Sequence, residues 1–294
     1  MYSIRMRFLV TFTFLIALLP AEAQTALADR WRAIAEDASG QVGAAAFIVE
    51  TGEHAALNGS GHFAMQSVYK LPIAMAFLQK VDERKLALDD RIEIPAKDYV
   101  PRDYSPLRDR FPGGAQITIR DLLHFSLVES DGTASDVLMK LAGGPKAVTT
   151  YIQSIGVNDL VVANSEMDMT WESQYDDWCT PEAATQLLAD LQKRNVVSPA
   201  SRALTLDDMQ ESQTGRNRIR NLLPEGTTVA DKTGTSWTRN GRTAATNDIG
   251  LITLPDGRHL ALAIFVADST APDAIREKVI ARIARAAWDQ WVHE

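Results

Sequence analysis

The chain is organised around the stretch Phe63-Ala64-Met65-Gln66-Ser67-Val68-Tyr69-Lys70-Leu71-Pro72. Ser67 stands three residues before Lys70, where an apolar run with helical spacing begins. Residues i and i+3 share one face of a helix, so the lysine would lie one turn from the serine. A serine hydroxyl is a weak nucleophile at neutral pH, and a partly buried lysine pushed toward its neutral form can take the proton. The helix start adds backbone N–H groups and a positive dipole end beside the serine.

Ser67 and Lys70 at this spacing are weak evidence by themselves, because a capping serine and a solvated lysine often have it. Two later segments change the interpretation. Glu129-Ser130-Asp131-Gly132 follows a predicted helix, and Asp231-Lys232-Thr233-Gly234-Thr235 lies on a predicted strand. Each also has an ordinary alternative when taken singly: a turn with a capping serine, or an edge strand with a solvated lysine.

The composition is that of an ordinary globular protein. The 294 residues are 46% hydrophobic and 23% charged, which suggests one or two folding units with ample core. The formal net charge is −8. An acidic chain argues against nucleic acid and an anionic membrane as partners. Cys179 is the only cysteine, so no internal disulfide can form, and we expect it to be a small buried hydrophobe.

Residues 1–23 have the pattern of a secretory signal peptide. Arg5 and Arg7 precede an apolar run over 8–19, and the segment ends in Ala21-Glu22-Ala23, where cleavage is predicted. A transmembrane anchor is the alternative, but the run is shorter than the ~20 residues that a span needs. We therefore expect a secreted or periplasmic protein that is free of the membrane once the leader is cut.

Strand patterns occur at both ends of the chain and helical patterns between them. Apolar or alternating segments at 42–49 and 54–57 predict a hairpin, and a second hairpin turn is predicted at Leu254-Pro255-Asp256-Gly257-Arg258. The predicted helices cover 26–37, 71–81, 119–126, 133–141, 145–155, 181–193, 198–209 and 272–292, and the later strands cover 227–235, 248–254 and 259–266.

The N-terminal hairpin has no partner strands until the C-terminal ones arrive. We therefore predict an α/β fold (an α+β sandwich), in which both ends of the chain build one antiparallel sheet with flanking helices. The discontinuous α/β domain would comprise residues 24–64 and 215–294. An all-α domain of residues 65–214 would be inserted between them, and sites tend to form at the seam of two such units.

Three short motifs stand in a fixed order: Ser-x-x-Lys at 67–70, Ser-Asp-x at 130–132 and Lys-Thr-Gly at 232–234. This order is typical of the penicillin-recognising serine acyltransferases. From about residue 29 to 291 the chain resembles a class A serine β-lactamase, and within that family the extended-spectrum branch typified by the PER and VEB enzymes. The resemblance implies a five-stranded sheet and an inserted helical domain. The longer matching segments are 65–68, 130–136, 214–218, 232–236, 243–248 and 254–258.

The resemblance implies a role for each matching residue. Ser67 would be the nucleophile that forms an acyl-enzyme. Lys70 would help to deprotonate it, although a glutamate is the rival acylation base in this family. Ser130 would pass the proton to the leaving nitrogen, and Lys232 would face the substrate carboxylate. The backbone N–H groups of Ser67 and Thr235 would form the oxyanion hole. Further substrate contacts are expected from Thr233, Gly234, Thr235, Arg218 and Tyr104.

Tyr104 is expected to flank the site entrance, and an ordinary loop anchor is an equally good interpretation of it. Hydrolysis also requires water to clear the acyl-enzyme, and the family uses a glutamate on an omega loop for this step. Glu166 holds that place in the segment 163–170. Asp168 and Glu172 are competing acids nearby, but order and spacing favour Glu166.

Three positions depart from the common pattern of the family. Gly132 stands where a side-chain amide usually contacts the substrate, so that contact is missing and room for a bulky group is expected. Thr170 replaces the asparagine that is commonest near the deacylating water. Asn164 replaces the arginine that usually tethers the omega loop. The PER-like branch also lacks this tether and has an acid at the position of Asp136, so we expect a differently folded loop.

These observations predict a secreted class A β-lactamase that hydrolyses the β-lactam amide through an acyl-enzyme. It would confer β-lactam resistance, including resistance to cephalosporins. We expect a monomer that acts on small-molecule β-lactams without metal, cofactor or nucleic acid. Two alternatives remain open: a penicillin-binding DD-peptidase, which would not need Glu166, and a β-lactam sensor that stays acylated.

Overall fold

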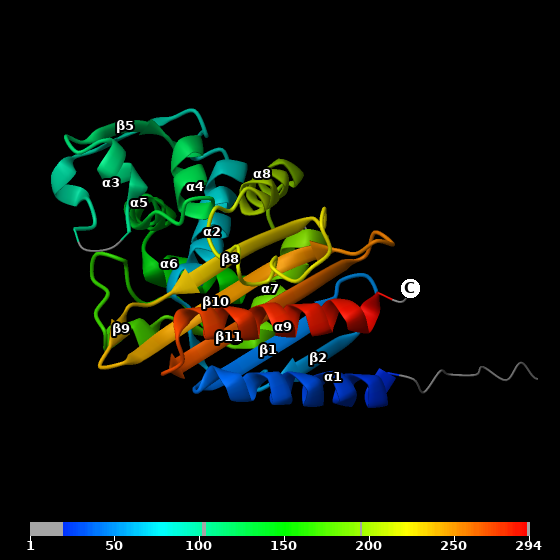
Figure 1. Ribbon diagram of the computed structural model, residues 1–294. Coiled ribbons are helices and arrows are strands. Elements are labelled where there is room, and N and C mark those ends of the chain that lie inside the picture. The colour runs from blue at the N-terminus through cyan, green and yellow to red at the C-terminus, as the bar shows by residue number, and fades with distance from the viewer. Residues whose placement is uncertain (1–19, 102–103, 195, 293–294) are drawn as a thin grey trace, which may run out of the picture.

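The computed structural model describes residues 20–101, 104–194 and 196–292 (Figure 1). The basic start and apolar run of the predicted leader, residues 5–19, lie outside the described residues, so export stays a prediction. Within the described ranges, no helix is both long and apolar enough to cross a membrane. The first helix, α1, covers Pro20–Ala35, and a 3-10 turn, η1, follows at Glu36–Ala38.

One antiparallel sheet joins the two ends of the chain, which confirms the predicted fold class. Its strands follow the order β2-β1-β11-β10-β8, and a short strand, β9, pairs with β10 outside that path. β1 pairs with β11 from Gln41↔Ala267 to Ile48↔Leu260, so an N-terminal strand lies beside the last one. The strands are β1 Gln41–Ile48, β2 His54–Leu57, β8 Val229–Thr235, β9 Thr238–Arg239, β10 Arg242–Thr253 and β11 His259–Ser269.

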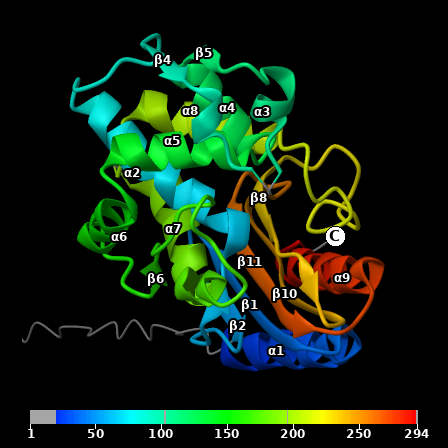
Figure 2. The same cartoon turned by 90° about the vertical axis from the view of Figure 1, so that its left-hand side faces the viewer.

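Helices cover both faces of this sheet (Figure 2). On one face, α1 and α9, Asp273–Trp291, share an apolar cluster that includes Trp31 and Ile283. The Trp31 ring N–H also donates to the backbone oxygen of Ile283 at 3.1 Å, which ties the two helices together. The opposite face packs against α2, Lys70–Asp82, and α7, Pro181–Lys193, in a second apolar cluster, which continues into the helices beyond them.

The helices that the sequence predicts between β2 and β8 begin within one residue of their predicted starts, whereas the short helix α3, Pro106–Arg110, was not predicted. The side chain of Thr118 accepts the backbone N–H of Asp121, and that of Thr180 accepts the N–H of Ala183, so both are N-caps. The elements are β3 Phe63–Ala64, η2 Gln66–Tyr69, α2 Lys70–Asp82, β4 Arg91–Ile94, η3 Ala96–Asp98, α3 Pro106–Arg110, β5 Ala115–Thr118, α4 Ile119–Leu127, α5 Gly132–Ala142, α6 Pro145–Ser154, β6 Leu160–Val161, η4 Ser173–Asp176, β7 Trp178–Cys179, α7 Pro181–Lys193 and α8 Pro199–Gln210.

Some strands differ from the predicted ones. β4 and β5 pair although a long segment separates them, so no hairpin turn signals their pairing. β10 begins at Arg242, ahead of the predicted start at 248, because Thr246 and Asn247 are polar yet buried beside the site. Cys179 is buried in β7, as expected, and burial raises the pKa of its thiol. The division into domains at residues 65 and 215 stays a prediction.

Candidate active site

Ser67 lies on the 3-10 turn η2, directly ahead of α2, and Lys70 is the first residue of that helix. The predicted one-turn separation is therefore present. Gln66 has a left-handed backbone, with φ of 49°, a conformation that a non-glycine residue adopts only when its surroundings hold it. The Asn247 amide on β10 donates to the backbone oxygens of Ala64 and Met65 at 2.8 and 3.1 Å. The central sheet thus supports the turn that carries the nucleophile.

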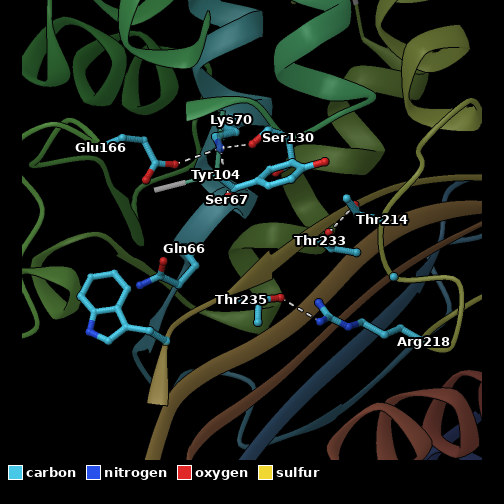
Figure 3. Close-up of a pocket in the computed structure, with 12 residues that line it drawn as sticks. Gln66, Ser67, Lys70, Tyr104, Ser130, Glu166, Thr214, Arg218, Thr233 and Thr235 are labelled. Carbon is cyan, nitrogen blue, oxygen red and sulfur yellow. Dashed lines mark hydrogen bonds and ion pairs between the residues drawn. The ribbon is translucent and has the colours of Figure 1, made fainter. Parts of the chain in front are cut away.

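Lys70 is the centre of the site (Figure 3). Its side chain is 1% exposed, and its Nζ contacts three groups. It lies 3.0 Å from Ser67 Oγ, 2.7 Å from the backbone oxygen of Ser130 and 2.9 Å from Glu166 Oε1. Besides its bond to Cε, the nitrogen has three positions for hydrogen bonds, and these contacts occupy all of them. One amine therefore touches the candidate nucleophile, the proton shuttle and the candidate base for deacylation.

Ser130 follows α4 in a left-handed conformation, with φ of 59°. Its backbone oxygen accepts from Lys70, and its Oγ accepts from Lys232 Nζ at 3.0 Å. Residues in sparsely populated backbone regions cluster at functional sites, where neighbouring groups hold them in place. The two lysines therefore contact both the backbone and the hydroxyl of Ser130, and the three sequence motifs meet in space.

Lys232 lies on β8 and is fully buried. The pKa of its ammonium is lowered to about 7, first because the group is buried and second because the positive charge of Lys70 lies nearby. Gly234 follows on the same strand, and a Cβ there would lie 2.3 Å from the backbone oxygen of Met65. Only glycine lets β8 pass this close to the nucleophile turn. In the Lys-Thr-Gly motif, the glycine is therefore required for close packing, and the lysine contributes the charge.

Hydroxyl groups and a guanidinium form the opposite end of the site. Thr233 Oγ1 lies 2.6 Å from the hydroxyl of Thr214. The Arg218 guanidinium donates to Thr235 Oγ1 at 2.7 Å (Figure 3), to the backbone oxygen of Asn247 at 2.9 Å and to that of Gly234 at 3.3 Å. Because most of its donors are used inside the protein, Arg218 mainly orients the Thr235 hydroxyl.

Glu166 enters the site from the segment 162–177 between β6 and β7, here called the omega loop. Its backbone N–H donates to Asp136 Oδ1 at 2.8 Å, and the next N–H, of Met167, donates to Asp136 Oδ2 at 2.9 Å. Both oxygens of one half-buried carboxylate therefore hold the loop from α5. Burial, together with the negative charge of Glu166, raises the pKa of Asp136 to about 7, although the two N–H donors oppose the shift.

A second carboxylate holds the start of the omega loop. Asp177 Oδ1 accepts the backbone N–H groups of Ala163 and Asn164 at 2.8 and 3.1 Å. Its Oδ2 accepts the side-chain amide of Asn164 at 2.8 Å, and the same amide nitrogen donates to the backbone oxygen of Ser173 at 3.0 Å. Backbone N–H groups and the Asn164 amide therefore donate to the Asp177 carboxylate, at the place where the family usually has an arginine tether.

The competing acids of the loop point to other partners. Asp168 accepts from the hydroxyl of Ser165 at 2.6 Å, and Glu172 pairs with Arg239 at 2.6 Å. Among the three candidate acids of the loop, Glu166, Asp168 and Glu172, it is Glu166 that contacts Lys70. This arrangement supports Glu166 as the residue that activates water.

The remaining predicted residues occupy different places. Tyr104 lines the catalytic pocket with 63% of its surface exposed, which favours an entrance residue over a loop anchor. A Cβ on Gly132 would make ordinary contacts of 3.4 Å with Glu166 Cγ and with the backbone oxygen of Tyr104, so a side chain can begin there without a clash. Thr170 lies outside the catalytic pocket, and its hydroxyl forms a bond of 3.1 Å with Ser173 Oγ.

The catalytic pocket has a volume of about 320 Å³. Four of its residues were not predicted as site residues: Gln66, Thr214, Gly215 and Trp237. The first three lie in segments that match the family, at 65–68 and 214–218, so the resemblance could have indicated them, whereas Trp237 lies just beyond the matching segment 232–236. In the described part of the chain, no group of three or more His, Cys, Asp or Glu side chains is arranged to hold a metal ion. The complete lining is Gln66, Ser67, Lys70, Tyr104, Ser130, Glu166, Thr214, Gly215, Arg218, Thr233, Thr235 and Trp237.

Comparison with known proteins covers nearly the whole chain. Residues 26–291 match the family described as the Beta-lactamase enzyme family. The chain is 38% identical to Beta-lactamase VEB-1 of Pseudomonas aeruginosa over 258 residues, which are 86% of each protein. It is also 38% identical to Extended-spectrum beta-lactamase PER-1 of the same organism over 235 residues, 79% of this chain and 76% of that enzyme.

Solved structures show the same relationship. A β-lactamase from Chitinophaga pinensis superposes with a TM-score of 0.88 and 42% identity, covering 90% of this chain and 98% of that one. The TLA-1 extended-spectrum β-lactamase superposes with a TM-score of 0.89 and 36% identity, covering 92% of this chain and 100% of that one. The shared fold therefore covers about nine tenths of this chain.

Proposed function

The chain belongs to the β-lactamase enzyme family and is a class A serine β-lactamase, and from this premise we propose how its residues divide the hydrolysis of a β-lactam. Ser67 forms the acyl-enzyme, and Glu166 directs its hydrolysis. The observation that supports this division is the position of Lys70 Nζ, within 3.0 Å of Ser67 Oγ and 2.9 Å of Glu166 Oε1.

Acylation begins at Ser67. Lys70 Nζ, 3.0 Å away, takes the hydroxyl proton while Oγ attacks the lactam carbonyl carbon. The backbone N–H groups of Ser67 and Thr235 receive the negative charge that develops on the carbonyl oxygen, a contact worth about 3 kcal/mol per donor in comparable sites. Ser130 then delivers its hydroxyl proton to the lactam nitrogen as the C–N bond breaks, and the proton that Lys70 took from Ser67 replaces it.

The substrate carboxylate lies at the end of the site built from Lys232, Thr233 and Thr235. Lys232 provides the positive charge, and the two hydroxyls provide hydrogen bonds. Lys232 also donates to Ser130 Oγ at 3.0 Å, which orients that hydroxyl toward the leaving nitrogen. Substrate binding and proton delivery are coupled through this lysine.

Deacylation depends on Glu166. Its carboxylate accepts a proton from a water molecule, whose oxygen attacks the acyl carbonyl carbon. As the ester C–O bond to Ser67 breaks, the proton returns from Glu166 through Lys70 to Ser67 Oγ. Asp136 holds the backbone of Glu166 and Met167, so the carboxylate approaches from a fixed direction.

Steady-state turnover of nitrocefin by the purified mature protein tests this function. The wild type is expected to turn over many equivalents, and Ser67→Ala is expected to be inactive. A single stoichiometric burst from the wild type would contradict the hydrolase and would favour a protein that stays acylated.

We also propose that the substrate range includes cephalosporins and that the protein acts outside the cytoplasm. The PER-like motif set of the sequence supports the first statement, and the leader pattern of residues 1–23 supports the second. Efficient penicillin turnover without turnover of any cephalosporin would overturn the first. Retention of the uncleaved chain in the cytoplasm of a Gram-negative host would overturn the second.

A further inference from the structure

Tyr69 is a fully buried tyrosine whose hydroxyl has no hydrogen-bond partner among the residues that the structure describes. It ends the 3-10 turn η2 that carries Ser67 and stands directly ahead of Lys70. Buried hydroxyl groups are nearly always hydrogen-bonded, because an unsatisfied one keeps the full cost of leaving water. An unpaired hydroxyl beside the nucleophile turn therefore points to a contact that forms during the reaction.

The electrostatic surroundings of this hydroxyl make it a donor. Burial raises the pKa of Tyr69 well above its ordinary value, and the negative charges of Glu166, Asp136 and Asp177 raise it further. The hydroxyl therefore keeps its proton near neutral pH and can donate it in a hydrogen bond. Among these carboxylates, Glu166 lies within reach of such a bond, which is not closed in this structure.

The existing hydrogen bonds also favour Glu166 as the acceptor. Asp136 accepts two backbone N–H groups of the omega loop, one on each oxygen. Asp177 accepts two more on Oδ1 and the Asn164 amide on Oδ2. Glu166 Oε1 contacts Lys70 Nζ at 2.9 Å (Figure 3), whereas Oε2 accepts no hydrogen bond from the described part of the chain. A free donor and a free acceptor therefore lie near each other at the residue on which deacylation depends.

The side chain that usually helps at this step in the family is replaced here. Thr170 stands where an asparagine is commonest near the deacylating water. Its backbone N–H and its hydroxyl instead bond to Ser173 Oγ, at 2.9 and 3.1 Å, and it lies outside the catalytic pocket. Another donor is therefore needed to orient the Glu166 carboxylate.

We propose that Tyr69 is a positioning residue for deacylation, and that its hydroxyl donates to Glu166 Oε2 in the acyl-enzyme. The inference rests on the proposed function, because it assumes that Glu166 activates the water. Catalytic hydrogen bonds are often long in a free enzyme and tighten in the reacting complex. With Lys70 at Oε1 and Tyr69 at Oε2, the plane of the carboxylate is fixed from its buried side. The hydroxyl keeps its own proton throughout.

Tyr69→Phe removes the hydroxyl alone and tests the proposal. Quenched single-turnover mixing with nitrocefin, followed by intact-protein mass spectrometry, measures both the formation and the decay of the acyl-enzyme. We expect decay to slow about tenfold, the effect of one hydrogen bond to a charged group, while formation keeps its wild-type rate. Where deacylation limits turnover, kcat and KM should fall together and kcat/KM should stay unchanged. The melting temperature should not fall, because the substitution removes a buried unsatisfied group.

Tyr151→Phe is the matched control. The Tyr151 side chain is also buried, but its hydroxyl donates to the backbone oxygen of Val196 at 2.8 Å, and it does not line the catalytic pocket. This variant should melt at a lower temperature and keep both rates, which is the opposite of the result expected for Tyr69→Phe.

A double substitution tests whether the hydroxyl acts through the carboxylate. In a Glu166→Ala background, Tyr69→Phe should not slow the residual decay of the acyl-enzyme any further, because two residues that act as one unit are not additive. An additional slowing there would overturn the proposal, since the hydroxyl would then act independently of Glu166.

Two results for the single Tyr69→Phe variant would also overturn the proposal. Decay at the wild-type rate would show that the hydroxyl is idle. Equal slowing of formation and decay would make Tyr69 a general support of the nucleophile turn. Failure of the proposed function gives a different result: the wild type itself would form no acyl-enzyme, or would form one that does not decay.

Discussion

Ser67, Ser130 and Lys232 are held at the junction of the sheet and the helices, whereas Glu166 stands on a loop held by two carboxylates. In the first region, buried side chains contact one another directly, and Gly234 brings β8 against the nucleophile turn. In the second, Asp136 and Asp177 hold backbone N–H groups of an exposed loop. The difference indicates that the acylating geometry is rigid, while the deacylating geometry depends on a few replaceable hydrogen bonds.

Lys70 contacts residues of both regions, so its substitution should have the largest effect on catalysis. Lys70→Ala removes the group that takes the proton of Ser67, and we expect acylation to slow by about 10²- to 10⁴-fold. Single-turnover mixing with nitrocefin measures this step. Lys80→Ala, at the other end of α2, is the control and should acylate normally. Acylation at the wild-type rate in Lys70→Ala would contradict the assigned role.

The pH dependence tests the rigid region alone. Burial lowers the pKa of Lys232 to about 7, so the free enzyme loses this positive charge as the pH rises above 7. Because kcat/KM reports the free enzyme, it should fall about tenfold per pH unit above about pH 8. Lys232→Arg carries a guanidinium that does not titrate in this range. A decline that is identical in Lys232→Arg would assign the titration to another group.

Asp136→Asn tests the attachment of the loop. An amide offers one acceptor oxygen where the carboxylate offers two, so either the Glu166 or the Met167 N–H loses its partner. An unsatisfied group of this kind costs about 1–3 kcal/mol, and we expect deacylation to slow about tenfold. Acylation should stay unchanged.

Pre-steady-state kinetics separates the two steps in Asp136→Asn. Asp168→Asn makes the same chemical change on the exposed side of the loop and should behave as the wild type. Equal slowing of acylation and deacylation in Asp136→Asn would show that the carboxylate supports the whole site and not the loop alone.

Gly132 lies where the two regions touch, and its substitution should have the smallest effect. A Cβ there would make ordinary contacts of 3.4 Å with Glu166 and Tyr104, so Gly132→Asn is expected to fold with an unchanged melting temperature. The added amide should lower KM about fivefold for substrates with an acylamino group, the effect of one hydrogen bond. Unchanged kinetics for every substrate would show that the glycine is neutral.

The rigid region could be predicted from the sequence, because its residues follow regular spacing. Ser67 and Lys70 share a helical face, and the strand patterns at both chain ends predict a common sheet. Ser130 and Lys232 were identified through their motifs and the family resemblance, and the structure brings them within hydrogen-bond distance of each other.

The loop region could be predicted only in part. Glu166 was identified by its order in the chain, but the bonds from Asp136 join side chain to backbone across a long separation and leave no periodic signal. Trp237 follows β8 in an unremarkable segment, and its position depends on contacts with Trp171 that arise only in the folded protein. Tertiary contacts between loops are the part that local patterns do not contain.

The division of labour between the two regions is tested most directly by Glu166→Ala. When mixed with nitrocefin, this variant should give a burst of about one equivalent and then stall. Intact-protein mass spectrometry of the stalled sample should show one covalently attached acyl group, which is absent in Ser67→Ala. Continuous turnover at the wild-type rate, or the absence of any burst, would contradict the account, because Glu166 would then be either dispensable for deacylation or required for acylation.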